Sequence, residues 1–212
     1  MSAALVWFRR DLRSVDHAAL AAALSAHARV HCAFVFDTDI LAPLLARGLK
    51  ADRRVAFIGR CLAELDAALR RQGGGLIVRH GRAVEEIPRL AAELRVAAVF
   101  ANRDHEPFAR QRDAAVAAAL AADGRAFRDF KDQTIFERDE VLTKGGTPFA
   151  VFTPYARAWR TRLAPTDLAP HECRACPGQL AVSPASTFFA GAACAARRSN
   201  SKPILPEASR TR

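Results

Sequence analysis

The 212-residue sequence lacks any uninterrupted apolar run of membrane-spanning length, although half of its residues are hydrophobic. It also lacks the positively charged start of a secretory signal, because the apolar run after Met1 carries Arg9 and Arg10 at its far end. A Walker loop, a metalloprotease pattern and the dinucleotide-binding Gly-x-Gly-x-x-Gly are absent as well. We therefore expect a cytoplasmic protein without a membrane segment.

Cysteine is scarce and odd in number. Five cysteines in a chain without an export signal favour reduced thiols over a disulfide framework. Cys173 and Cys176 have Cys-x-x-Cys spacing, but a zinc site needs four ligands at regular spacing, and a redox pair needs a helix start after a strand. We expect no metal site.

Charge is unevenly distributed. The net charge is +10, yet residues 173–212 contain six basic residues against one acidic residue. The rest of the chain is only mildly basic, so its charge alone does not indicate a nucleic-acid surface.

Short apolar runs alternate with helical patterns along the chain, which is typical of a parallel sheet covered on both faces. The sequence therefore predicts an α/β fold with a doubly wound, Rossmann-like, five-stranded parallel sheet. The expected strands are Leu5 to Phe8, Val30 to Phe36, Leu76 to Val78, Ala97 to Ala101 and Ala126 to Phe130.

Helix signals lie between these runs. Apolar residues from Val55 to Leu69 recur at steps of three and four, and Gly73 is placed to end that helix. Asp16 is a candidate cap for a first helix, Pro88 suits the first turn of another, and residues 108–123 predict a further one.

The alternation of apolar runs and helical patterns becomes irregular towards the end of the chain. We expect an α/β domain over residues 1–131, an exit or linker segment over 132–165, and an irregular, poorly ordered tail over 166–212. The tail composition is compatible with a sequence read in a shifted frame.

One charged stretch stands where ligands bind in open parallel sheets. "RRDLR", residues 9–13, follows the first predicted strand, beyond its carboxyl end. "LVWFRRDLRSVDHAAL" resembles the amino-terminal signature of the DNA photolyase and cryptochrome family. Three later segments resemble the family in the same order: "ADRRVAFIGRCLAELDAAL", "NRDHEPFARQRDAAV" and "TPFAVFTPYARAW".

The resemblance implies an amino-terminal domain that binds an antenna chromophore. In the family, that domain serves a separate helical domain that holds FAD and binds damaged DNA. Residues 164–212 do not resemble the helical domain, so we expect a truncated, monomeric chain that does not repair DNA by itself and whose catalytic residues are not among those present.

Family resemblance also indicates the antenna type. "DHEPFARQR" is similar to the loop of the deazaflavin or flavin type, whereas the folate type has an Asn-Glu pair where this chain has Phe108 and Ala109. The implied chromophore contacts are Val35, Phe36, Asp37, Arg54, Asp104, Glu106, Arg110 and Arg112. Arg54 and Arg112 are equally suited to ion pairs that fix the loop. Trp7 is expected to face the core.

The leading function is light-driven repair of cyclobutane pyrimidine dimers by the full-length protein. The alternatives are a cryptochrome-like blue-light receptor and a non-catalytic module that binds a chromophore or a nucleotide. In the family, Arg10, Asp11 and Arg13 face the neighbouring domain, so we expect them to lack partners in this chain.

Overall fold

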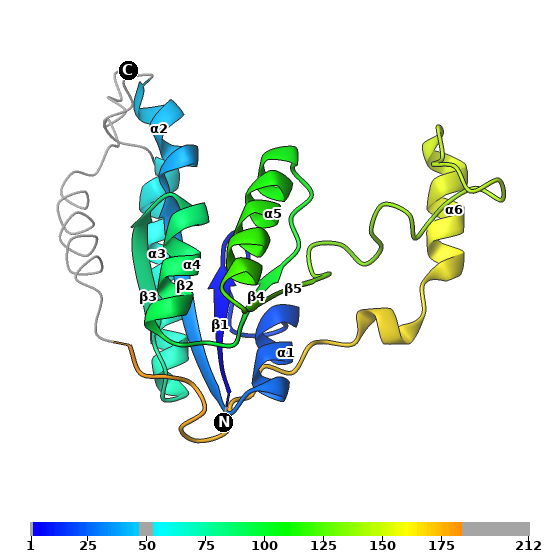
Figure 1. The fold of residues 1–212 in the computed structure, drawn as a ribbon. Helices are drawn as coiled ribbons and strands as arrows, with labels where there is room; N and C mark the ends of the chain where they lie inside the picture. Colours follow the sequence, from blue (N-terminus) through cyan, green and yellow to red (C-terminus); the bar gives the residue numbers. More distant parts are fainter. Residues whose placement is uncertain (1, 47–52, 184–212) are drawn as a thin grey trace, which may run out of the picture.

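A single parallel sheet forms the centre of the molecule. The computed structural model describes residues 2–46 and 53–183. Its five strands are all parallel, in the order β3-β2-β1-β4-β5 (Figure 1). They are β1 (Ala3–Phe8), β2 (Arg29–Asp37), β3 (Leu76–Gly81), β4 (Ala98–Asn102) and β5 (Ala126–Phe130). The predicted fold class is confirmed.

Helices cover both faces of the sheet. The α-helices are α1 (Ala18–Ala26), α2 (Thr38–Ala46), α3 (Arg53–Arg71), α4 (Ala83–Glu93), α5 (Pro107–Ala122) and α6 (Phe152–Arg162), followed by a 3₁₀ helix, η1 (Pro165–Leu168). The helices α1 and α3 pack on one face, and α4 and α5 pack on the other. Because β1 and β2 are covered on both sides, almost every residue in them is buried and apolar.

Helix ends agree only partly with the sequence predictions. The helix α3 ends before Gly73, whose φ of +85° is easily adopted without a side chain. The predicted Asp16 cap is wrong, because the neighbouring His17 side chain accepts the hydrogen bond from the Leu20 N–H. Pro88 lies inside α4, which begins at Ala83, and not in its first turn.

Residues 165–183 differ from the expected poor order. Val30 N–H donates to the Gln179 carbonyl and Ala181 N–H donates to the Val30 carbonyl, so Leu180 bridges to the start of β2. Leu180 is buried in the core. The chain approaches so closely here that a Cβ on Gly75 would lie 2.5 Å from Ser183 Oγ. The remainder of the predicted tail lies outside the described residues.

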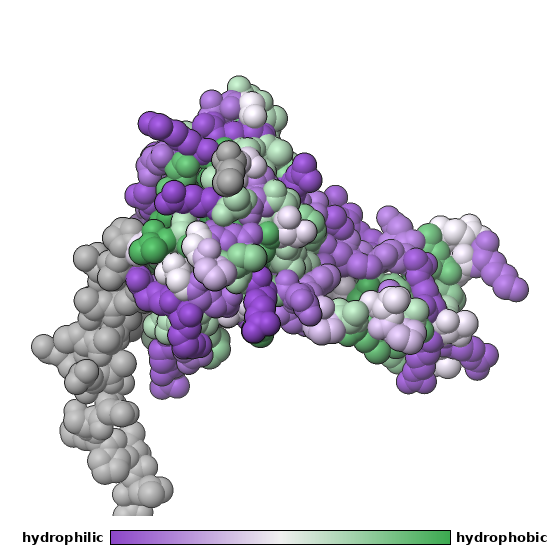
Figure 2. Space-filling model, turned by 90° about the horizontal axis from the view of Figure 1, so that it is seen from below, coloured by the Kyte–Doolittle hydropathy of each residue, from purple (hydrophilic) through white to green (hydrophobic). Residues whose placement is uncertain are grey.

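The segment around α6 projects from the sheet domain (Figure 1). None of its helical residues is buried, and Val151 and Phe152 beside its start are exposed. Seen from below in Figure 2, hydrophobic and hydrophilic residues intermingle on this projection. Among residues 2–46 and 53–183, no helix is long and apolar enough to cross a membrane.

Candidate chromophore site

A cavity of about 450 Å³ lies at the carboxyl ends of the central strands; we call it the rim cavity. The chain runs from β1 to β2 on one side and reaches β4 on the other, so the strand order reverses beside β1. Open α/β sheets bind ligands at this position, and the cavity volume lies within the range of small-molecule sites.

Most of the chromophore contacts implied by the family resemblance come together at this cavity. Its lining includes Val35, Phe36, Asp37, Arg54, Asp104, Glu106 and Arg112, and Phe108 and Ala109 from the discriminating loop. Arg110 does not line it and is exposed on α5. The ends of β1 and β2, together with α2, α3 and α5, therefore surround one space.

Two residues that line the cavity each carry a buried polar atom without a hydrogen-bond partner. Asp37 is 6% exposed, and its Oδ1 accepts from the backbone N–H groups of Asp39 and Ala83 at 3.1 and 3.3 Å. Its Oδ2 is unpartnered, and so is Nη2 of Arg9. Buried polar groups are nearly always satisfied, so an unpaired acceptor and an unpaired donor on two residues of one cavity mark that cavity as a candidate ligand site.

The floor of the cavity includes Trp7, which is 1% exposed and also belongs to the core. The guanidinium carbons of Arg9 and Arg112 lie over its ring, 4.9 and 4.8 Å from the centroid. One carboxylate, Asp113, pairs with both arginines, at 2.5 Å from Arg9 and 2.9 Å from Arg112. Arg112 thus combines an ion pair with a place on the cavity wall.

Arg10 has partners at the same rim. Its guanidinium pairs with exposed Glu106 at 2.7 Å and lies 3.7 Å from the buried Asp104 carboxylate. The hydrogen bond to Glu106 raises the pKa of Arg10, so this side chain remains charged. The expectation that Arg10 lacks a partner is wrong.

Asp11 also pairs within the domain. Its Oδ2 accepts from Asn102 Nδ2 at 2.7 Å and lies 2.9 Å from His17 Nε2. The Leu20 N–H can only donate, so His17 Nδ1 is its acceptor and Nε2 carries the proton towards Asp11. Burial would raise the pKa of Asp11, but His17 and the Arg9 backbone N–H lower it to about 2.

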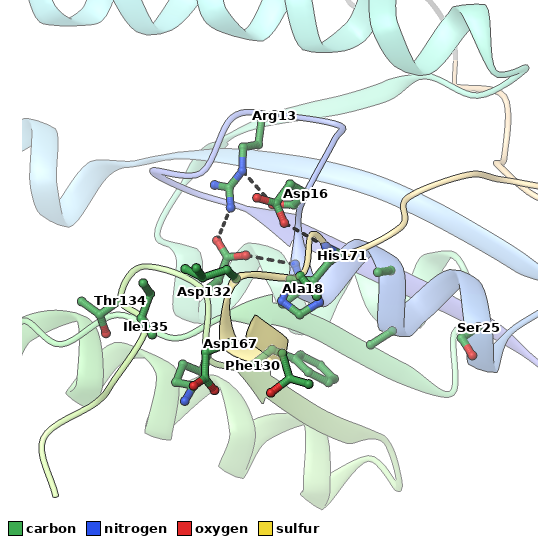
Figure 3. A pocket seen from close by; sticks show the side chains of 16 residues that line it. Arg13, Asp16, Ala18, Ser25, Phe130, Asp132, Thr134, Ile135, Asp167 and His171 are labelled. Atoms are coloured by element: carbon green, nitrogen blue, oxygen red, sulfur yellow. Dashed lines mark hydrogen bonds and ion pairs between the residues drawn. The ribbon is translucent and has the colours of Figure 1, made fainter. Parts of the chain in front are cut away.

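Arg13 is held by the segment after β5. Figure 3 shows its guanidinium between Asp132, at 2.7 Å, and the Asp16 carbonyl, at 2.9 Å. The other Asp132 oxygen accepts from the Ala18 N–H at the start of α1. The expectation of unpartnered interdomain residues therefore fails at all three positions, because "RRDLR" is folded into its own domain.

The hollow in Figure 3 is larger, about 770 Å³, and lies beside α1 and η1. Its acidic side chains already accept hydrogen bonds: Asp16 from the His171 N–H and Asp167 from the Ala164 N–H. None of the unpaired buried side-chain atoms found in the described residues lines this hollow. The rim cavity is the better candidate for a ligand site.

Arg9 and Trp7 are among the contributors that reasoning from the sequence missed. Arg9 was noted only as part of the charged stretch, and Trp7 only as a core residue, yet both line the rim cavity. The continuous apolar run of β1 correctly indicates that Trp7 is buried. It does not reveal that this buried side chain lies at the last layer, where the core ends and the cavity begins.

These features define a class: a doubly wound α/β domain with a ligand-sized cavity at the point where strand order reverses. The family model described as DNA photolyase matches residues 4–176. The chain belongs to the DNA photolyase family, as the resemblance predicted.

Known relatives are longer than this chain. A deoxyribodipyrimidine photo-lyase of Synechococcus sp. is 36% identical over 165 residues, covering 78% of this chain and 33% of the relative. A class III photolyase structure from Agrobacterium tumefaciens has a TM-score of 0.70 at 27% identity, covering 88% of this chain and 36% of that one. An archaeal photolyase structure from Sulfolobus tokodaii, described with two FAD molecules and a novel light-harvesting cofactor, has a TM-score of 0.66 at 25% identity. It covers 91% of this chain and 41% of that one. The chain thus spans about a third of the curated photolyase it matches.

Proposed function

We propose that this chain is the antenna-binding domain of a deoxyribodipyrimidine photolyase, which takes part in light-driven repair of pyrimidine dimers. The observation that carries the proposal is the rim cavity, with an unpaired acceptor on Asp37 and an unpaired donor on Arg9. Family membership supplies the activity, and the cavity supplies a place for a light-absorbing ring.

A flavin or deazaflavin fits the chemistry of this cavity. Such a ring system needs apolar walls, which Val35, Phe36 and Ile58 provide, and polar groups at one edge. Asp37 Oδ2 would accept a ring N–H, while Arg9 and Arg54 would hold carbonyl or phosphate oxygens. When bound, the ring supplies absorption of near-ultraviolet and blue light.

Folate is the less favoured antenna. Phe108 and Ala109 line the cavity where the folate type has an Asn-Glu pair. The archaeal relative described with two FAD molecules and the implication of a novel light-harvesting cofactor supports a flavin-type occupant. The proposal therefore ranks flavin and deazaflavin above folate.

Repair needs more than this domain. The proposal assigns FAD and damaged DNA to a helical domain with which the chain would act in the cytoplasm, as part of a monomeric protein. The chain alone is expected to leave cyclobutane dimers intact under blue light. Dimer loss measured with the isolated 212-residue protein would contradict this assignment.

The direct test is reconstitution. The purified chain is titrated with 8-hydroxy-5-deazaflavin, FMN, FAD, methenyltetrahydrofolate and ATP, with absorbance and thermal shift as readouts. We expect saturable binding of a flavin or deazaflavin. Binding of ATP alone would instead support a nucleotide-binding module, and indifference to all five would reject the proposal.

Asp37→Asn sharpens the test. The amide keeps an oxygen for the N–H groups of Asp39 and Ala83 and changes only the unpaired acceptor into a donor. Ring affinity should fall by at least about tenfold, corresponding to one lost hydrogen bond to a charged group. The matched control is Asp129→Asn, which alters a carboxylate of β5 that pairs with Arg103 away from the cavity. The control should bind like the wild type.

A further inference from the structure

Trp7 creates a photochemical problem for the proposed site. A photoexcited flavin-type ring is a strong one-electron oxidant, and indole is among the side chains most readily oxidised. Trp7 lines the cavity, so its indole is within reach of a bound ring. Transfer of one electron from the indole to the ring, followed by its return, would dissipate the excitation before it could be passed on.

The surroundings of Trp7 oppose that transfer. The guanidinium groups of Arg9 and Arg112 both lie within 5 Å of the ring centroid, at 4.9 and 4.8 Å. A neutral indole is attracted to these cations, whereas an indole radical cation would be repelled by them. The two arginines therefore stabilise the reduced form of Trp7 relative to its oxidised form.

Burial strengthens the electrostatic effect of Arg9 and Arg112 on the oxidation of Trp7. The arginine side chains are each 8% exposed and Asp113 is 14% exposed, so water and salt screen their charges weakly. Asp113 neutralises only one of the two positive charges. These three groups together leave one net positive charge beside the indole, and the fold holds them in place.

We propose that Arg9 and Arg112 protect the excited antenna by making Trp7 difficult to oxidise. This inference rests on the proposed function, since the oxidant is the bound flavin-type ring in its excited state. In the protected step one electron would leave the indole for the ring, no proton would move, and the same electron would return.

The test uses the fluorescence lifetime of deazaflavin bound to the chain at saturation. Arg112→Gln removes one positive charge and should shorten the fluorescence lifetime several-fold. Arg112→Lys keeps the charge and should retain most of the wild-type lifetime. In Trp7→Phe/Arg112→Gln the oxidisable ring is gone, so the lifetime should recover. A merely structural Arg112 would not produce this rescue.

The outcomes separate the two proposals. Failure of the wild-type chain to bind any flavin-type ring rejects the proposed function. Binding with an unchanged lifetime in Arg112→Gln, or shortening that persists without Trp7, rejects the protective role.

A second measurement needs no chromophore. The only other tryptophan is Trp159, and the only tyrosine is Tyr155, both on the projecting α6. With both changed to Phe and the thiols alkylated, protein-film voltammetry reports Trp7. Its oxidation potential should be lower in Arg112→Gln than in the unchanged protein, and equal potentials would overturn the inference.

Discussion

Buried polar side chains near the first loop differ in how completely their hydrogen bonds are satisfied. Towards α1, the side chains of Asp11, His17 and Asn102 satisfy one another and the backbone. At the rim cavity, Arg9 and Asp37 each keep a buried atom without a partner. One side is a closed structural network, and the other lines a cavity. Two of the six unpaired buried side-chain atoms found in the described residues thus belong to residues of this one cavity, which marks it as a candidate binding site.

The largest expected effect comes from breaking the closed network. Asp11→Ala leaves buried His17 and Asn102 without their shared acceptor, so the free energy of unfolding should fall by about 3–5 kcal/mol. Urea denaturation followed by circular dichroism measures this. Glu85→Ala, which removes an exposed ion pair with Arg82, serves as the control and should cost about 0–1 kcal/mol. Similar losses of unfolding free energy in both variants would show that the closed network contributes no more to stability than an exposed ion pair.

Acid should weaken the same network by a smaller amount. The pKa of Asp11 is lowered from 3.8 to about 2, so its contribution is complete above pH 3.8 and is lost as the pH falls through 2. The shift corresponds to roughly 2 kcal/mol. Unfolding free energies measured between pH 5 and pH 2 should therefore decline more steeply in the wild type than in Asp11→Asn, and parallel curves would contradict the closed-network assignment.

The smallest effect on stability is expected at the open side. Without a ligand, Asp37→Asn should raise the free energy of unfolding by less than about 1 kcal/mol, because it replaces a buried carboxylate that has one unpaired oxygen by a neutral amide. Thermal denaturation without FMN measures the stability of the ligand-free proteins. The same measurement with FMN shows how much the bound ring stabilises each of them. The wild type should gain stability from the ring and the variant should not. A large loss in the ligand-free variant would mean that Asp37 is structural.

Much of the fold was predictable because it depends on local patterns. Continuous apolar runs such as β1 indicate strands buried on both faces, and the spacing from Val55 to Leu69 indicates the amphipathic α3. Seven of the eight chromophore contacts that the family resemblance implied line the rim cavity. Three local signals were misread. Pro88 lies inside α4 and not in its first turn. Asp16 has the residue type of a helix cap, yet its neighbour His17 caps α1 because its ring is fixed by Asp11. The apolar stretch that forms α2 was not recognised as a helix, since Pro43 lies inside it.

By itself, the sequence determined the layers of this protein: which segments are strands, where most of the helices lie, and that the first loop lies at the ligand-binding edge. These follow from periodicity, which acts over a few residues. Only the tertiary structure decided which charges at that edge are satisfied. Asp11 finds its partner 91 residues away in Asn102, and Arg13 finds Asp132 at a separation of 119, while one atom each of Arg9 and Asp37 finds none. Hydrogen bonding over such separations depends on where the packed elements bring side chains together, and no local pattern encodes it.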